Sequence, residues 1–144
     1  MLTTNQLGAI AESEIVSAAL KLGVGVFSAV HDERYDLVFD LRPQLLRVQC
    51  KTAALSGDVI VIRCYSCRRN AEGPLKRLYT SDEIDAVEAY CGELDRAFLR
   101  FCRTHRRPLA HPAPPPSAAE HQVIGVDWAD DFDLAATLER LKGP

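Results

Sequence analysis

Residues 34–51 read RYDLVFDLRPQLLRVQCK, and this stretch decides the fold. Apolar and polar residues alternate on both sides of a short break at 41–44, which contains a proline. Such alternation is typical of β-strands with one buried face, and a break with a proline suits a turn. We therefore predict two antiparallel strands, in which Leu46, Val48 and Cys50 face the core.

The polar side chains of this hairpin suit phosphoryl chemistry. Matching the apolar sides of the two strands brings Asp36 to the same surface as Gln49 and Lys51, which share a face of the second strand. Carboxylate and amide oxygens can hold a hard divalent cation, and a lysine can offset the charge on a phosphoryl group under attack. The arrangement is nuclease-like.

The segment before the hairpin has the spacing of a helix. Apolar residues recur at helical intervals from Thr4, the expected N-cap, to Leu22, and Gly23 should end the helix. Glu12 lies away from the central apolar stripe, so by itself it is interpreted as a solvated helix acid. A first strand is expected over residues 24–30.

Four pieces of the chain, in their order and spacing, resemble the PD-(D/E)XK nuclease superfamily. The greatest likeness is to the PD-(D/E)XK endonucleases that are similar to group I intron homing enzymes. The pieces are residues 8–12, 35–38, 49–52 and 79–85. The resemblance implies an α/β (mixed α+β) fold with a restriction-endonuclease-like core, in which an N-terminal helix precedes a mixed central β-sheet flanked by helices.

The same resemblance implies roles for individual residues. Asp36 would be the principal ligand of Mg²⁺ or Mn²⁺, with Glu12, the Gln49 side chain and the main-chain carbonyl of Cys50 as further direct or water-mediated ligands. Lys51 would orient or activate the attacking water. Gln49 departs from the usual Asp or Glu, so the site would hold its cation with one negative charge fewer, as in some members of the intron-related branch.

The predicted function is therefore that of a Mg²⁺-dependent endodeoxyribonuclease. One alternative is a catalytically inactive nuclease fold that binds nucleic acid or a protein, which the neutral Gln49 favours. Another is an assembly or regulatory protein, which predicts no DNA binding even at low salt. Because enzymes that cut both DNA strands usually present two sites, we expect a homodimer or homotetramer.

Length and composition set broad limits. A chain of 144 residues with 47% hydrophobic content predicts one domain over 1–144. There is neither an apolar run of membrane-spanning length nor a start typical of a signal segment, so we expect a cytoplasmic protein without a membrane partner. Five cysteines, an odd number, favour reduced thiols over a disulfide framework.

Positive charge is concentrated in the first part of the chain. Residues 1–116 carry 15 Lys and Arg against 14 Asp and Glu, whereas residues 117–144 carry 2 against 6. Arg68, Arg69, Lys76 and Arg77 lie in a polar segment, 66–80, which we predict to be a long loop that contacts DNA. The alternative for this cluster is solvated surface.

The rest of the chain gives a coarse scaffold. Residues 59–62 are apolar throughout and predict a central strand covered on both faces. A short turn of helix near Ser81 should precede a hairpin over 86–101. Residues 105–120 hold five of the eight prolines and predict an extended linker or loop, followed over 121–144 by a short strand at 123–126 and a helix from Asp130 or Asp131.

The cysteines offer two rival sites. Cys64, Cys67, Cys102 and His105 have spacings that suit a structural zinc ion, but a lone CxxC pair favours buried or incidental thiols, so we expect no zinc. Cys50 stands beside Lys51 like a nucleophile. Its place on the inward face favours packing instead.

Overall fold

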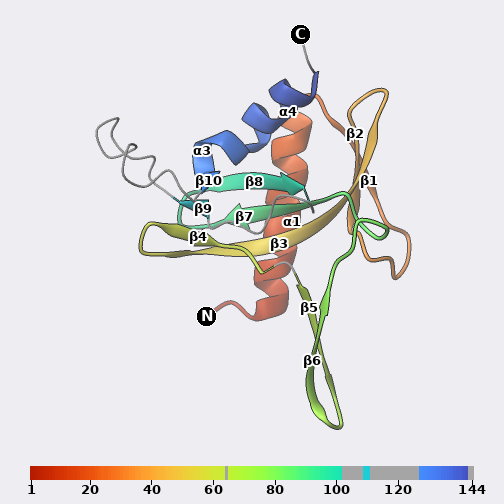
Figure 1. The fold of residues 1–144 in the computed structure, drawn as a ribbon, viewed down its shortest axis with the longest axis vertical. Helices are drawn as coiled ribbons and strands as arrows, with labels where there is room; N and C mark the ends of the chain where they lie inside the picture. Colours follow the sequence, from red (N-terminus) through yellow and green to blue (C-terminus); the bar gives the residue numbers. More distant parts are fainter. Residues whose placement is uncertain (64, 102–108, 111–126, 143–144) are drawn as a thin grey trace.

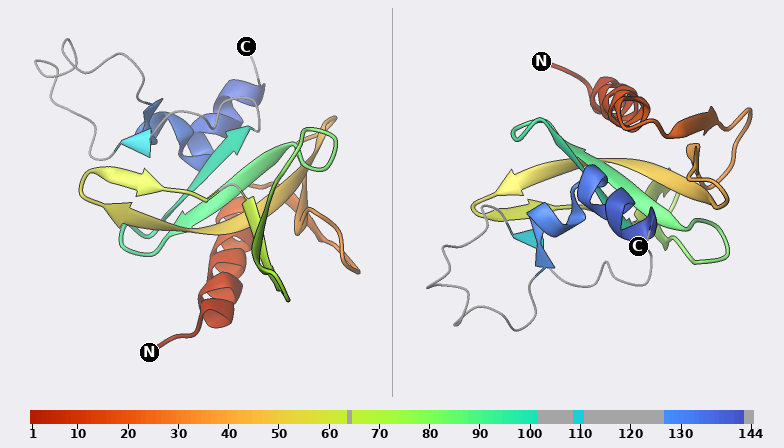
Figure 2. Two further views of the ribbon diagram at one scale, coloured as in Figure 1. Left: turned by 60° about the horizontal axis from the view of Figure 1, so that its bottom comes forward. Right: turned by 90° about the horizontal axis from the view of Figure 1, so that it is seen from above.

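The computed structural model describes residues 1–63, 65–101, 109–110 and 127–142. A mixed sheet lies at its centre, with α1 (Thr4–Lys21) on one face and α3 (Ala129–Phe132) and α4 (Leu134–Lys142) on the other, as Figures 1 and 2 show. This architecture confirms the predicted α+β fold, in which an N-terminal helix precedes a mixed sheet flanked by helices.

Helix α1 begins with a capping box one residue earlier than expected. Thr3, and not Thr4, is the N-cap: its hydroxyl accepts from the N–H of Gln6 at 3.2 Å, and the Gln6 side chain accepts from the N–H of Thr3 at 2.8 Å. Thr3 is the better N-cap because Gln6, three positions later, has a side chain that can accept a hydrogen bond from the N–H of the cap. The residue three positions after Thr4 is Leu7, which cannot. Gly23, with φ of +76°, follows the end of the helix as predicted.

The long strand β3 (Leu45–Ser56) pairs with three other described strands of the main sheet. The described strands of this sheet are β1 (Gly25–Ser28), β2 (Leu37–Asp40), β3, β4 (Val59–Val61), β7 (Ala86–Cys91), β8 (Arg96–Phe101), β9 (Leu109–Ala110) and β10 (Asp127–Trp128). Strand β3 pairs antiparallel with β2 through residues 45–48, parallel with β7 through 48–53 and antiparallel with β4 through 54–56. Residues 49–53 thus lie between the β2 and β4 pairings, where β7 is their partner among the described strands.

The hairpin of β2 and β3 matches the prediction. Leu37 lies opposite Val48 and Phe39 opposite Leu46, and all four side chains are buried. They pack with Ile15 and Ala19 of α1 and with Leu134 and Leu138 of α4 in one apolar cluster. The inward face of this hairpin therefore holds it in register, because a slip of one residue would expose every one of these side chains.

Of the predictions for the later strands of the sheet, one is confirmed and one is wrong. The hairpin of β7 and β8 is confirmed, and a hydrogen-bonded turn at 81–83 precedes it. Strand β4 is paired on both edges, with β3 and β9, but the prediction that both its faces are covered is wrong. Ile60 is buried whereas Val61 is 41% exposed, since the described helices lie over other strands.

The largest correction concerns residues 66–80, which are not a loop. Residues 66–78 belong to a separate two-stranded hairpin of β5 (Tyr65–Asn70) and β6 (Gly73–Leu78), which projects from the body in Figure 1 and is called the arm below. Gly73, with φ of +121°, follows the turn between its strands. Most of the described side chains of the arm are exposed, so its sequence lacks the apolar alternation that marks a half-buried strand.

The C-terminal part is described only in pieces. Most of the predicted linker at 105–120 and the strand predicted at 123–126 lie outside the described residues, although Leu109 and Ala110 form β9. The helix begins at Ala129 and is divided at Asp133 into α3 and α4. Within the described part of the chain, no helix is both long and apolar enough to span a bilayer.

Candidate active site

Asp36 lies directly before β2 and forms hydrogen bonds with residues 48–50 of β3, where the pairing of β2 with β3 ends. Its N–H donates to the carbonyl oxygen of Val48 at 2.9 Å. Its carboxylate oxygen Oδ2 accepts from the N–H of Cys50 at 2.8 Å and from Nε2 of Gln49 at 2.7 Å. The pairing of β2 with β3 therefore sets the position of this carboxylate, as the sequence predicts.

Two oxygen atoms at this place converge on one point. Nε2 of Gln49 lies 2.7 Å from Oδ2 of Asp36 and 3.4 Å from the main-chain carbonyl oxygen of Cys50. The amide NH₂ group carries partial positive charge, so a carboxylate and a carbonyl oxygen are turned toward a shared electropositive neighbour. The same two oxygens suit a hard divalent cation, which takes oxygen ligands.

Helix α1 brings Glu12 near Asp36. The helix contacts β3, and Oγ1 of Thr52 donates to the carbonyl oxygen of Leu7 at 3.4 Å between these two elements. The pKa of Glu12 is raised, first by burial and then by the negative charge of Asp36. The two carboxyl groups thus act on each other, although their elements are far apart in the sequence.

The pKa of the Asp36 carboxyl is raised overall, although its neighbours oppose the rise. Burial raises the pKa of its carboxyl, while the N–H of Cys50 and the positive charge of Lys51 lower it. A carboxylate in this setting has donors that favour its charged form and a burial cost that opposes it. A bound cation would add to the first effect and so favour the ionised carboxylate.

Lys51 is held at the root of the arm. Its Nζ donates to the main-chain oxygen of Tyr65 at 3.2 Å and to the hydroxyl of Tyr79 at 3.1 Å, and it lies 5.0 Å from the centre of the Tyr79 ring. Its positive charge nevertheless acts on Asp36, where it opposes part of the rise in pKa that burial causes. Lys51, Asp36, Gln49 and Glu12 are therefore brought into one region of the molecule.

Cys50 contributes its main chain to the site and its side chain to the core. The side chain packs against the apolar cluster of β2, β3 and α1. Burial raises the pKa of the thiol strongly, with the charges of Asp36 and Glu12 as further causes. Because the thiolate is the reactive form, this environment disfavours a nucleophilic role, in agreement with the inward orientation predicted for Cys50.

The sequence did not indicate the contacts around Tyr79, which accepts a hydrogen bond from Lys51. Arg34 lies 4.1 Å over the Tyr79 ring and forms an ion pair with Glu83 at 3.3 Å. Neither contact can be recognised from the spacing of residues in the sequence, because Tyr79 and Glu83 are 45 and 49 positions away from Arg34. Both Tyr79 and Glu83 do belong to residues 79–85, one of the four pieces that resemble the PD-(D/E)XK family, and this was the one indication that they lie near the site.

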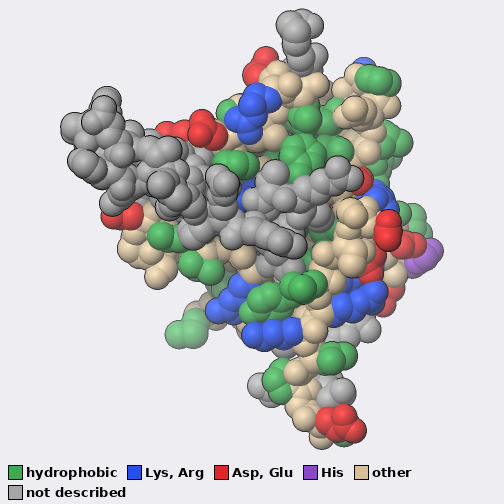
Figure 3. Space-filling view, viewed as in Figure 1, with side chains coloured by type: hydrophobic (Ala, Val, Ile, Leu, Met, Phe, Trp, Pro, Cys, Tyr) green, Lys and Arg blue, Asp and Glu red, His purple; other side chains and the backbone are tan. Residues whose placement is uncertain are grey.

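The basic residues of the arm differ in how they are held. Arg77 is ion-paired with Glu83 yet 64% exposed, and Nζ of Lys76 lies 4.9 Å from the centre of the Tyr65 ring. Arg68 and Arg69 belong to β5, opposite Leu75 and Pro74, and their side chains lie outside the description. Figure 3 shows Lys and Arg side chains gathered around the root of the arm.

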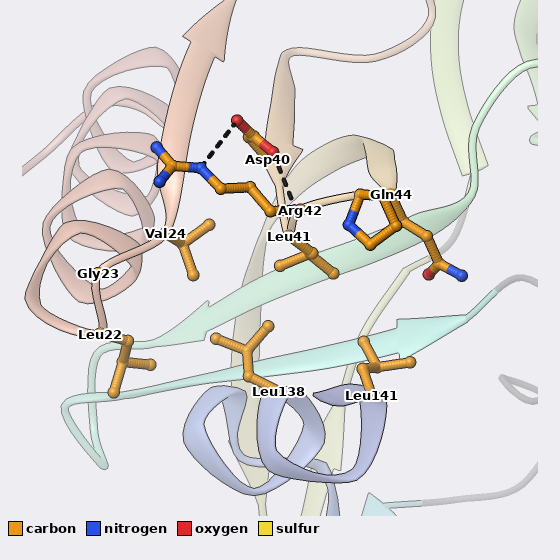
Figure 4. A pocket seen from close by; sticks show the side chains of 10 residues that line it. Leu22, Gly23, Val24, Asp40, Leu41, Arg42, Gln44, Leu138 and Leu141 are labelled. Atoms are coloured by element: carbon orange, nitrogen blue, oxygen red, sulfur yellow. Dashed lines mark hydrogen bonds and ion pairs between the residues drawn. The ribbon is translucent and has the colours of Figure 1, made fainter. Parts of the chain in front are cut away.

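Other candidate sites are less developed. Within the described residues, no three Asp, Glu, His or Cys side chains are grouped as a metal site. The predicted alternative zinc ligands Cys64, Cys102 and His105, and the side chain of Cys67, lie outside the described residues. A cavity of about 270 Å³ between the end of α1, the β2–β3 turn and α4, shown in Figure 4, is lined by none of the candidate site residues.

Comparisons with known proteins identify the family and the fold. The family model described as PD-(D/E)XK endonuclease matches residues 2–110. A search of curated proteins gave no match. Among solved structures, the bacterial homing endonuclease I-Ssp6803I is similar, with a TM-score of 0.73 and 24% identity over 99% of this chain and 96% of that chain; at this identity the likeness establishes the fold. Because the family match includes α1, β2, β3 and the arm, the chain belongs to the PD-(D/E)XK endonuclease family.

Proposed function

We propose that this protein is a metal-dependent endonuclease that hydrolyses phosphodiester bonds of DNA. The observation that carries the proposal is the convergence of the Asp36 and Cys50 oxygens on one point, with the Lys51 ammonium close enough to oppose the rise in the pKa of Asp36 that burial causes. Membership of an endonuclease family supports nuclease chemistry. The choice of DNA and the need for a cation are parts of the proposal.

The donor set fits Mg²⁺ or Mn²⁺. Oδ2 of Asp36 and the carbonyl oxygen of Cys50 would be ligands, together with Oε1 of Gln49 after rotation of its amide and with Glu12 directly or through water. When bound, such a cation polarises a phosphoryl oxygen and lowers the pKa of a water molecule. Since Gln49 is neutral, the negative charge of the site comes from Asp36 and Glu12 alone.

Lys51 has the chemistry to bind the phosphate or the attacking water. An ammonium has three N–H donors, and two of them are directed to Tyr65 and Tyr79. The third donor can reach a phosphate oxygen or a water molecule. A fixed positive charge in a partly buried position stabilises the negative charge that develops on the phosphoryl group.

The arm supplies a surface for DNA. It begins beside Lys51 and carries Arg68, Arg69, Lys76 and Arg77. These cations can neutralise backbone phosphates, which gives affinity that decreases as salt increases. We further propose that the active form is a homodimer or homotetramer, because cutting both strands calls for two copies of the site.

A cleavage assay tests this function. Supercoiled and branched DNA are incubated with the wild-type protein and with Asp36→Ala in Mg²⁺ or Mn²⁺, with chelator as control. We expect cleavage by the wild type that is lost in the variant and in chelator. Salt-sensitive binding without cleavage by either protein would instead support the second candidate, an inactive binding module, which the neutral amide of Gln49 favours.

A further inference from the structure

We propose that Tyr79 is a positioning residue for Lys51, and that through it the arm and the lysine are mechanically coupled. This inference rests on the proposed function, because it assigns a task to Lys51 in phosphodiester cleavage. It adds a residue that touches neither the candidate metal ligands nor, in the proposed mechanism, the reacting phosphate.

The first observation is the placement of the two acceptors of the Lys51 ammonium. Tyr65, whose main-chain oxygen accepts one bond, is the first residue of β5, and Tyr79, whose hydroxyl accepts the other, directly follows β6. The two ends of the arm therefore meet at one ammonium. A displacement of either strand at its root moves an acceptor of Lys51.

The second observation is that the Tyr79 ring is itself fixed. The guanidinium of Arg34 lies 4.1 Å from the ring centre, within the range of a cation–π contact. Arg34 in turn donates to Oγ of Ser66 at 2.9 Å and to the carbonyl oxygen of Leu78 at 3.2 Å, and it forms the ion pair with Glu83. Three contacts thus hold the arginine against the root of the arm.

The physical consequence concerns the long lysine side chain. A free lysine samples many rotamers, and it contributes most to a reaction when its charge is held where it is needed. The Tyr79 hydroxyl and the Tyr65 carbonyl restrict Nζ to one place and leave one N–H donor for the phosphate or water. Contacts of the arm with DNA would act on the same two acceptors.

The test is Tyr79→Phe, which removes the hydroxyl and keeps the ring under Arg34. We expect the single-turnover cleavage rate in Mg²⁺ to fall between about 10-fold and 100-fold, with DNA affinity in Ca²⁺ unchanged. Tyr90→Phe is the matched control, because its hydroxyl donates to Asp95 at the β7–β8 turn and the same chemical change there should leave the rate unaltered. An unaltered rate in Tyr79→Phe, beside a cleaving wild type, would overturn the inference.

A double-mutant cycle separates positioning from a general structural effect. If Tyr79 acts through Lys51, Tyr79→Phe should cause no further loss in a Lys51→Ala background. Losses that multiply in the double variant would show that Tyr79 acts independently of the lysine.

A measurement without cleavage keeps the inference distinct from the proposed function. The ¹⁵N signal of the Lys51 ammonium, assigned with Lys51→Arg, should show restricted motion in the wild type, more motion in Tyr79→Phe, and wild-type motion in Tyr90→Phe. Equal motion in all three proteins would contradict positioning by Tyr79. A wild type that shows this pattern but never cleaves DNA would refute the proposed function alone.

Discussion

Asp36 and Glu88 both neighbour Cys50 of β3, Asp36 from the residue before β2 and Glu88 from β7. Asp36 precedes β2 and accepts hydrogen bonds from the Cys50 N–H and from Gln49. Glu88 stands opposite Cys50 on β7 and is 0% exposed, and neither of its carboxyl oxygens has a hydrogen-bond partner among the described residues. Both acids therefore neighbour Cys50, and burial raises the pKa of both, but of the two only the Asp36 carboxylate accepts hydrogen bonds from neighbours in the described part of the chain.

The two carboxyl groups differ in the hydrogen-bond donors and charges that surround them. Burial raises the pKa of both groups, but donors and Lys51 oppose that rise at Asp36, whereas at Glu88 the charge of Asp133 adds to it. The donors and Lys51 thus favour the ionised form of Asp36 against the cost of burial, as the proposed cation site requires. Glu88 is stable in the fold in its neutral form.

Removing the charge of Asp36 should have the largest effect. For Asp36→Asn we expect a loss of about 1,000-fold or more in single-turnover cleavage, because the principal charged ligand is gone. Gel-resolved cleavage in Mg²⁺ measures the loss. Asp40→Asn is the control: Asp40 is also on β2 but pairs with Arg42 at the turn, so its rate should remain that of the wild type.

Lys51→Ala should follow, with a loss of about 100-fold to 1,000-fold in the same assay. The side chain is held by two hydrogen bonds at the root of the arm and lies outside the apolar clusters, so chemical denaturation should show little change in stability. A variant that cleaves as fast as the wild type would remove Lys51 from the chemistry.

Glu88→Gln should change stability and leave cleavage untouched. A carboxyl whose pKa is raised in the fold contributes stability below its unfolded pKa, and this contribution is lost as pH rises through the folded pKa. Near pH 8 the variant should therefore be more stable than the wild type by about 1–3 kcal/mol, with the gap closing toward pH 4. Urea unfolding across this pH range measures it; parallel pH profiles for the two proteins would refute the neutral-acid assignment.

Gln49→Glu would give Asp36 a second carboxylate as its neighbour in place of the amide that donates to it, as Glu88 has the charge of Asp133 nearby. Without divalent cations we expect a loss of about 1 kcal/mol in unfolding free energy. Mg²⁺ should restore it, because a cation replaces the missing positive partner. Thermal melts with and without Mg²⁺ provide the measurement, and Gln44→Glu, at the exposed β2–β3 turn, should show neither effect.

Much of the fold follows from local patterns in the sequence. Alternation around 34–51 gives the hairpin of β2 and β3, and helical spacing gives α1 to within one residue of its end. The arm was missed because most of its described side chains are exposed, which leaves no apolar alternation to read. The break between α3 and α4 at Asp133 was missed because the apolar spacing continues through it.

The candidate site was predictable only where it depends on the alternation of residues along neighbouring strands. Strand register places Asp36 beside Gln49 and Cys50, so short-range alternation is enough to locate them. The contacts of Tyr79 with Lys51 and Arg34 join separate elements through side chains, and no periodicity encodes them. The contrast between Asp36 and Glu88 likewise depends on donors supplied by neighbouring strands.

The most direct test of the contrast is a crystal structure of the protein with DNA and Mn²⁺, in which anomalous scattering locates the ion. We expect Mn²⁺ bound to Oδ2 of Asp36 and the carbonyl oxygen of Cys50, with Glu88 free of metal and the Lys51 ammonium facing the phosphate. Mn²⁺ bound elsewhere, with no ion at Asp36 in crystals of a DNA-cleaving protein, would contradict the assignment of Asp36 as the metal-binding carboxylate.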